Sequence, residues 1–192
     1  MAKRKPCFSV LGAGHGGLAM AGHVALMGFR VNLWNRSKER IDHVVERGGI
    51  DLEGEIDGFS SLNMATANIG EAIDGADILM VVVPAYGHKN VSEKLAPHLE
   101  DGQTIVLNPG RTCGAIEFDK VLRDSGSNAD VTIAETQTLI YVARHLEFAR
   151  ARIFQINNTV PLAALPPDRT SSALKALRVA YTQFVSGTNV LV

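Results

Sequence analysis

The chain has 192 residues, 46% of them hydrophobic and 20% charged, and a formal net charge of -1. This length is enough for one hydrophobic core, or for one domain and a little more. The near-neutral charge argues against a nucleic-acid-binding protein, which usually carries a basic face. Two isolated cysteines, Cys7 and Cys113, do not make a disulfide framework, so we expect a reducing, cytoplasmic location.

The basic N-terminus followed by apolar residues has some likeness to a signal peptide. The apolar run is short, however, and glycines and His15 interrupt it. The longest apolar run, "ILMVVVPAY", falls well short of the ~20 residues that a membrane helix needs. We therefore expect neither a membrane partner nor a nucleic-acid partner, and no bound metal.

In chain order, short apolar runs alternate with segments of helical composition. The runs predict strands at 7–11, 29–34, 77–83, 103–108 and 131–135. The segments between them predict helices at 15–28, 37–48, 69–76, 88–99 and 115–126. This alternation predicts an α/β fold with a doubly wound, Rossmann-like parallel sheet, covered by helices on both faces.

Three segments are less regular. The helix at 37–48 has Ser37 as its expected N-cap, and Ile41, Val44 and Val45 are expected on one face. "GIDLEG" and "SLNMATAN" could be two short strands that pair as a hairpin. After residue 135, "TLIYVAR" and "ARIFQIN" predict a few additional strands, and a helix at 168–181 is expected to begin with Asp168 or Thr170 as its cap.

A glycine cluster lies between the first strand and the first helix. Gly12, Gly14 and Gly17 fit the pattern G-x-G-x-x-G in the strand–turn–helix context that makes it informative. Gly12 would allow the tight turn, Gly14 would admit a pyrophosphate, and Gly17 would let helix and strand pack closely. Gly16 and His15 lie in the same loop, where His15 could contact the pyrophosphate or face solvent. Backbone amides at the helix start would face the anion.

The second strand ends in Asn35 and Arg36, where an NAD-selective site usually places an acid about 20 residues after the glycines. Asn35 can bond a hydroxyl or a phosphate and does not repel a 2′-phosphate. Arg36 can form a charge-assisted, bidentate contact with that phosphate, or it is a solvated surface arginine. The missing acid favours NADP(H) over NAD(H).

Two further strands end in proline turns. Val83, Pro84 and Ala85 follow one strand, and Asn108 with Gly110 follow the next. In an open parallel sheet, ligands lie beyond the carboxyl ends of strands, so both turns are candidates for contact with the cofactor. The alternative is ordinary turn chemistry. Glu135 could face the same cleft, whereas His88 is expected simply to start a helix.

"GAGHGGLAMAGHVALMGFRVNLWNR", "VVVPAYGH", "LNPGRTCGAIEF" and "AETQTLIYVAR", in this order, resemble the N-terminal dinucleotide-binding domain of the octopine/nopaline type of opine dehydrogenase. The resemblance covers nearly the whole chain, from about Cys7 to Val192. It implies a dehydrogenase that uses NAD(P)H to condense an amino acid reductively with a 2-oxo acid such as pyruvate.

The resemblance also implies a C-terminal helical domain that carries the catalytic histidine and its acidic partner. Residues 1–192 correspond to the cofactor domain alone, so no catalytic residue is assigned and we expect the isolated chain to be inactive. The apolar surface that such a domain covers could cause the chain to self-associate as a homo-oligomer. Two alternatives stay open: a relative of glycerol-3-phosphate dehydrogenase or ketopantoate reductase, and a stand-alone dinucleotide-binding module.

Overall fold

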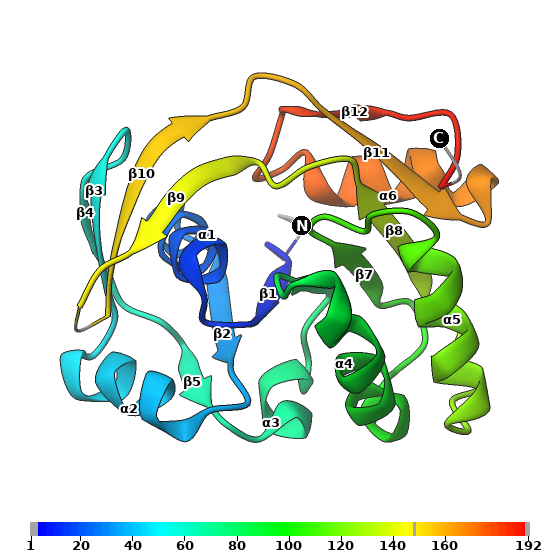
Figure 1. The fold of residues 1–192 in the computed structure, drawn as a ribbon, viewed down its shortest axis with the longest axis horizontal. Coiled ribbons are helices and arrows are strands. Elements are labelled where there is room, and N and C mark those ends of the chain that lie inside the picture. Colours follow the sequence, from blue (N-terminus) through cyan, green and yellow to red (C-terminus); the bar gives the residue numbers. More distant parts are fainter. Residues whose placement is uncertain (1–3, 148, 191–192) are drawn as a thin grey trace.

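The computed structural model describes residues 4–147 and 149–190. In this part of the chain the strands form two sheets (Figure 1). The first sheet has the order β12-β11-β8-β7-β6-β1-β2-β5. Its strands are β1 (Cys7–Leu11), β2 (Arg30–Trp34), β5 (Met64–Thr66), β6 (Ile78–Val81), β7 (Thr104–Leu107), β8 (Thr132–Thr136), β11 (Val160–Leu165) and β12 (Phe184–Ser186). The second sheet has the order β4-β3-β10-β9, with β3 (Ile50–Gly54), β4 (Gly58–Ser60), β9 (Tyr141–His145) and β10 (Arg150–Ile156).

The central strands of the first sheet are parallel from β5 to β8, as the alternating sequence pattern predicts. All four residues of β6 and of β7 are buried. Strands covered on both faces need such continuous apolar runs, which is why these segments were readable from the sequence. The predicted Rossmann-like α/β fold is confirmed.

Helices cover both faces of the first sheet. They are α1 (His15–Leu26), α2 (Lys38–Arg47), α3 (Ile69–Ile73), α4 (His88–Leu95), α5 (Gly114–Asp124) and α6 (Thr170–Leu177). One core contains buried residues of α1, α2 and α6, such as Leu18, Ile41 and Leu177. The other contains residues of α3, α4 and α5, such as Ile73, Leu95 and Phe118. Short 3₁₀ turns occupy Ala85–Gly87, Ala96–His98 and Pro167–Arg169.

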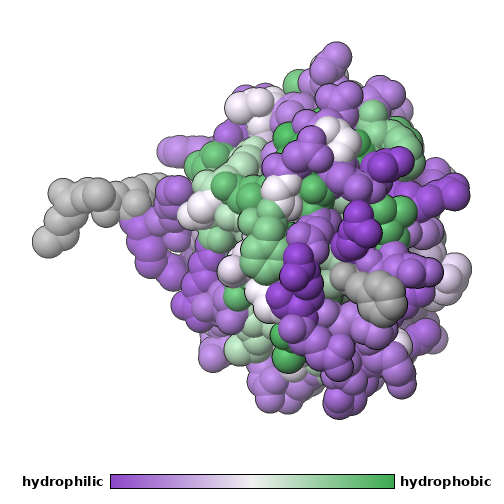
Figure 2. All heavy atoms as spheres, turned by 90° about the vertical axis from the view of Figure 1, so that its left-hand side faces the viewer, coloured by the Kyte–Doolittle hydropathy of each residue, from purple (hydrophilic) through white to green (hydrophobic). Residues whose placement is uncertain are grey.

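The second sheet arches over α1, which therefore lies between two sheets (Figure 1). Gly22 of α1 makes this close approach workable, because a Cβ there would come within about 3.0 Å of the Leu52 side chain. The outer surface of the second sheet, seen in Figure 2, mixes apolar and charged side chains. Phe59, Val142 and Phe154 are exposed there, and Arg152 forms an ion pair with Glu53 at 2.9 Å.

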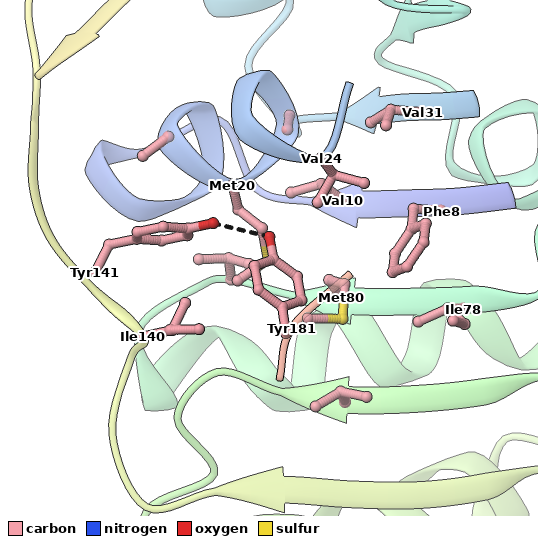
Figure 3. Packing of buried hydrophobic residues seen from close by; sticks show 14 of the residues in the cluster. Phe8, Val10, Met20, Val24, Val31, Ile78, Met80, Ile140, Tyr141 and Tyr181 are labelled. Atoms are coloured by element: carbon pink, nitrogen blue, oxygen red, sulfur yellow. Dashed lines mark hydrogen bonds between the residues drawn. The ribbon is translucent and has the colours of Figure 1, made fainter. Parts of the chain in front are cut away.

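A chain of polar groups crosses the core between α1, β9 and the segment after α6. Nδ1 of His23 lies 2.8 Å from the hydroxyl of Tyr141, which donates to the hydroxyl of Tyr181 at 2.9 Å (Figure 3). Both tyrosines are almost fully buried. Burial raises the pKa of both hydroxyls and lowers the pKa of His23, so the groups stay neutral near pH 7.

Val45 is 57% exposed, whereas Ile41 and Val44 on the same face of α2 are buried. One expectation about strand pairing was wrong. The expected hairpin between "GIDLEG" and "SLNMATAN" does not form, since β3 pairs with β4 and β5 joins the first sheet parallel to β2. Asn63 explains this choice: its amide donates to the Asn32 side chain at 2.7 Å, which ties the segment to β2.

The expected N-cap of the last helix was also wrong. Neither Asp168 nor Thr170 caps α6; Arg169 occupies the N-cap position and Asp168 lies in the preceding 3₁₀ turn. The hydroxyl of Thr170 instead accepts the backbone N–H of Ala164 at 3.0 Å, so it ties the helix to β11. Strand β11 itself, antiparallel to β8, was not predicted.

Candidate dinucleotide-binding site

A cleft of about 510 Å³ lies at the carboxyl ends of β1, β2 and β6. Its lining includes seven of the residues predicted for the site: Gly12, Gly14, His15, Asn35, Arg36, Val83 and Pro84. It also includes residues that were not predicted, among them Trp34, Ser37, Arg40, Tyr86, Asn90 and His145. Of the other candidates, Gly16, Gly17, Ala85, Asn108 and Gly110 lie outside this lining.

The three glycines of the G-x-G-x-x-G pattern have different roles. Gly12 has φ +121°, and a Cβ there would lie 2.4 Å from the carbonyl oxygen of Val82. A Cβ on Gly17 would lie 1.7 Å from the carbonyl oxygen of Gly12. A Cβ on Gly14, in contrast, would meet no atom of the described structure within 4 Å. Packing therefore requires Gly12 and Gly17, while Gly14 leaves open space on the cleft side, which fits close approach of a pyrophosphate.

The N-terminus of α1 supplies donors to the same space. The first helical bond runs from the N–H of Leu18 to the carbonyl of Gly14 at 3.1 Å, so the amides of His15, Gly16 and Gly17 precede the helical ladder. No acidic residue lies in the first turn. The positive end of the helix dipole therefore faces the cleft without a competing carboxylate.

Asn35 holds the glycine loop to the end of β2. Its Oδ1 accepts the N–H of Ala13 at 3.0 Å, and its Nδ2 donates to the carbonyl of Ser37 at 3.1 Å. The amide that the sequence suggested for a ribose or phosphate is thus engaged with backbone groups. Asn35 lines the cleft chiefly as the residue that shapes it.

Positive charge collects on this side of the cleft. Arg36 and Arg40 are both exposed and both line it, and the guanidinium of Arg40 donates to the carbonyl of Ala13 at 3.3 Å. Arg40 lies in the first turn of α2, four residues after Arg36 in the sequence. Another part of the lining is mainly apolar and includes the exposed ring of Tyr86; it is formed by Val82, Val83, Pro84, Tyr86 and Gly87.

A pair of histidines from distant parts of the chain also lies at the cleft. Nδ1 of His15 accepts the backbone N–H of His145 at 2.8 Å, and the ring centroids are 6.4 Å apart. Burial lowers the pKa of His145, and the neighbouring Arg40, His15 and His43 lower it further. No sequence signal marks His145, because only the arch of the second sheet brings β9 to α1.

The second proline turn approaches Glu135 outside the cleft lining. Oε2 of Glu135 accepts the N–H of Ala115 at 2.7 Å, at the start of α5, and a Cβ on Gly110 would lie 2.3 Å from the same oxygen. Burial raises the pKa of this carboxyl, and the bond from Ala115 opposes the rise. Asn108 is buried, and its amide donates to the carbonyl of Val106 at 2.8 Å.

His88, Arg144 and the two cysteines lie outside the cleft lining. His88 starts α4, as expected, and is buried. Arg144 is exposed on β9, and Cys7 and Cys113 are both free thiols. Among the described residues there is no cluster of metal-ligating side chains, and none of the helices there has the length and apolar character to cross a membrane.

Comparison with known proteins agrees with this geometry. A family model for the N-terminus of NAD-dependent glycerol-3-phosphate dehydrogenase matches residues 8–110. An opine dehydrogenase of Arthrobacter sp. (strain 1C) is 36% identical over 185 residues, which is 96% of this chain and 51% of that protein. A glycerol-3-phosphate dehydrogenase of Moorella thermoacetica is 34% identical over 56% of this chain and 32% of its own length.

A solved structure of octopine dehydrogenase with NADH and pyruvate superimposes with a TM-score of 0.82 at 22% identity. It covers 97% of this chain and 51% of that one. Yersinopine dehydrogenase with NADP⁺ gives a TM-score of 0.79 at 16% identity, over all of this chain and 49% of that one. These likenesses show the fold.

The fold and the glycine loop define a nicotinamide-dinucleotide-binding domain of a dehydrogenase, and the chain belongs to the family of NAD-dependent glycerol-3-phosphate dehydrogenase N-terminal domains. Within that family, the predicted resemblance to the N-terminal dinucleotide-binding domain of opine dehydrogenases is confirmed. The chain spans about half the length of the opine dehydrogenase of Arthrobacter and a third of that of the Moorella protein.

Proposed function

We propose that the chain is the cofactor-binding domain of an opine-type dehydrogenase that prefers NADP(H) to NAD(H). The observation that carries the cofactor preference is the pair Arg36 and Arg40, which line the cleft beyond β2 where an NAD site would place an acid. Two guanidinium groups favour a 2′-phosphate, and no carboxylate of the cleft lining repels it.

The residues present fit a dinucleotide. The amides at the start of α1 and the open space at Gly14 accommodate the pyrophosphate, and the apolar part of the lining that includes Tyr86 fits a flat ring. When bound, the reduced nicotinamide supplies a hydride. The turns at Pro84 and at Asn108–Gly110 follow neighbouring parallel strands, so in this proposal they border the nicotinamide end of the cofactor.

The reaction that we propose for the whole protein is reductive condensation of an amino acid with a 2-oxo acid such as pyruvate. The 36% identity to an opine dehydrogenase over 96% of this chain supports it. We place the catalytic residues in a second, helical domain, and the domain formed by residues 1–192 is then a binding domain without turnover of its own. We also propose a cytoplasmic location, in keeping with two free cysteines.

Calorimetric titration of this chain with NADPH and with NADH, at one salt concentration, tests the cofactor proposal. Tighter binding of NADPH is the expected result. Tighter binding of NADH would keep the dinucleotide site and overturn the preference. Binding of neither would contradict the proposal for residues 1–192.

The family match also favours a second candidate, an oxidoreductase of the glycerol-3-phosphate dehydrogenase type. Product analysis of the intact protein separates the two. An amino acid with pyruvate should give a secondary amine dicarboxylate, whereas dihydroxyacetone phosphate or ketopantoate should leave NADPH unoxidised. Oxidation of NADPH with one of the latter two would favour the second candidate.

Self-association of the chain is part of the proposal, because Phe59, Val142 and Phe154 are exposed on the second sheet. Sedimentation over a concentration series checks it. A strictly monomeric chain at high concentration would count against it.

A further inference from the structure

A hydrogen bond joins the start of α1 to the end of β9. His15 is the first residue of α1, and its Nδ1 accepts the backbone N–H of His145, 130 residues away, at 2.8 Å. A nitrogen that accepts a hydrogen bond carries no proton, so in the neutral ring the proton lies on Nε2. The backbone of the second sheet thereby fixes both the tautomer and the orientation of a side chain that lines the cleft.

The surroundings of this ring favour an anion. His15 follows Gly14, whose missing side chain leaves open space, and it belongs to the α1 N-terminus with its free amides. The Arg40 guanidinium approaches the same loop through the carbonyl of Ala13 at 3.3 Å. His145 lines the cleft as well. Groups from α1, α2 and β9 therefore meet where the glycine loop would hold a pyrophosphate.

We propose that His15 donates a hydrogen bond from Nε2 to the pyrophosphate of the dinucleotide, and that the backbone N–H of His145 holds His15 in the tautomer that allows it. The second sheet is then part of the cofactor site, although its side chains outside His145 do not line the cleft. This inference rests on the proposed function, since it needs a dinucleotide in the cleft.

Two substitutions of His15 separate the two ring nitrogens. The amide of glutamine reaches the place of Nε2 and can donate there. The amide of asparagine reaches only the place of Nδ1, where its oxygen can still accept the N–H of His145. We expect His15→Asn to weaken NADPH and ADP-ribose alike by roughly ten- to a hundredfold, the range for a lost bond to a charged group. His15→Gln should restore most of the affinity.

ADP-ribose carries the pyrophosphate without the nicotinamide, so equal losses for both ligands locate the contact. His98→Gln, an exposed histidine outside the cleft lining, is the control for the loss of a histidine. In the ligand-free protein, a scalar coupling between the His145 amide nitrogen and Nδ1 of His15 should be detectable by NMR. That measurement does not depend on cofactor binding or on a variant that folds.

The possible results separate failure of this inference from failure of the proposed function. Absence of the coupling, or equal affinities of wild type, His15→Asn and His15→Gln, would overturn this inference and leave the proposed function intact. A loss with NADPH but not with ADP-ribose would also overturn it, because the contact would then lie away from the pyrophosphate. A wild-type chain that binds no dinucleotide would overturn the proposed function and this inference with it.

Discussion

The α-carbon of Gly17 lies against the carbonyl oxygen of Gly12, so closely that a Cβ on Gly17 would come within 1.7 Å of that oxygen. This contact joins the first turn of α1 to the residue that follows β1, and Gly12 and Gly17 are both buried. The obstructing atom belongs to the backbone and cannot rotate away. Gly17 is thus required by packing inside the domain, in contrast to Gly14.

We expect Gly17→Ala to destabilise the fold by more than about 3 kcal/mol, because backbone must move to admit the methyl group. Gly14→Ala should cost about 1 kcal/mol or less, since Gly14 has ordinary extended angles (φ -84°, ψ -166°) and open space beside it. Its methyl group should instead weaken dinucleotide binding. Urea denaturation and calorimetry of both variants check this; equal destabilisation by the two would refute the division of roles.

Arg36→Ala should weaken NADPH about ten- to a hundredfold and change NADH little, because only NADPH carries the 2′-phosphate. Lys38→Ala is the matched control: Lys38 is a nearby exposed cation that pairs with Asp42 at 2.7 Å and does not line the cleft. Calorimetric titration of each variant with both cofactors gives the comparison. Equal losses for the two cofactors would show that Arg36 does not read the 2′-phosphate.

Acid should destabilise the domain through two histidines, the half-buried His23 and the buried His88. Burial lowers the pKa of His23 and of His88 below the ordinary value of 6.5, so below that pH the unfolded chain binds protons that the folded chain does not. The free energy of unfolding should therefore fall as the pH drops below 6.5, by up to about 1.4 kcal/mol per pH unit for each histidine.

Urea denaturation at pH 8, 6.5 and 5.5 measures this dependence. His88→Gln should reduce its slope, while His98→Gln, which removes an exposed histidine, provides the control. Stability that rises on acidification over this range would contradict the prediction.

The two tyrosines of the polar chain should differ in their contribution to stability. Tyr141 lies in the middle, so Tyr141→Phe leaves both His23 and the Tyr181 hydroxyl without their partner and should cost about 1–3 kcal/mol. Tyr181→Phe removes only the end of the chain and should cost about 0.5–1.5 kcal/mol. Denaturation of both variants decides the order, and a larger loss for Tyr181→Phe would be inconsistent with this arrangement.

Much of the first sheet was predictable because its strands are short apolar runs with glycines between the elements. The positions of the glycine loop and of Arg36 at the cleft were predictable because each comes just after the end of a strand. Strand β11 was missed because Pro161 lacks an N–H and interrupts an apolar run that would otherwise indicate a strand. The carbonyl of Pro161 accepts the N–H of Gln137 at 3.0 Å.

The cleft residues contributed by tertiary packing were not predictable from local pattern. His145 reaches the glycine loop only because the second sheet arches over α1. The pairing of β5 with β2 was also not predictable from local pattern, because the hydrogen bond from Asn63 to Asn32 joins residues that are 31 positions apart in the sequence. Glu135 was considered for the cleft because it lies at the end of a strand, but it is outside the cleft lining and its carboxylate accepts the N–H of Ala115.

Because α1 is enclosed between two sheets, its backbone should become little more ordered when a ligand binds. Eight residues of α1 are buried, on several sides of the helix, so its hydrogen-bonded amides from Leu18 onward should exchange with solvent only when the whole domain opens. The helix that presents its N-terminus to the cleft then belongs to the most slowly opening part of the molecule. A ligand that binds there meets donors already in place, and little ordering of the backbone opposes its affinity.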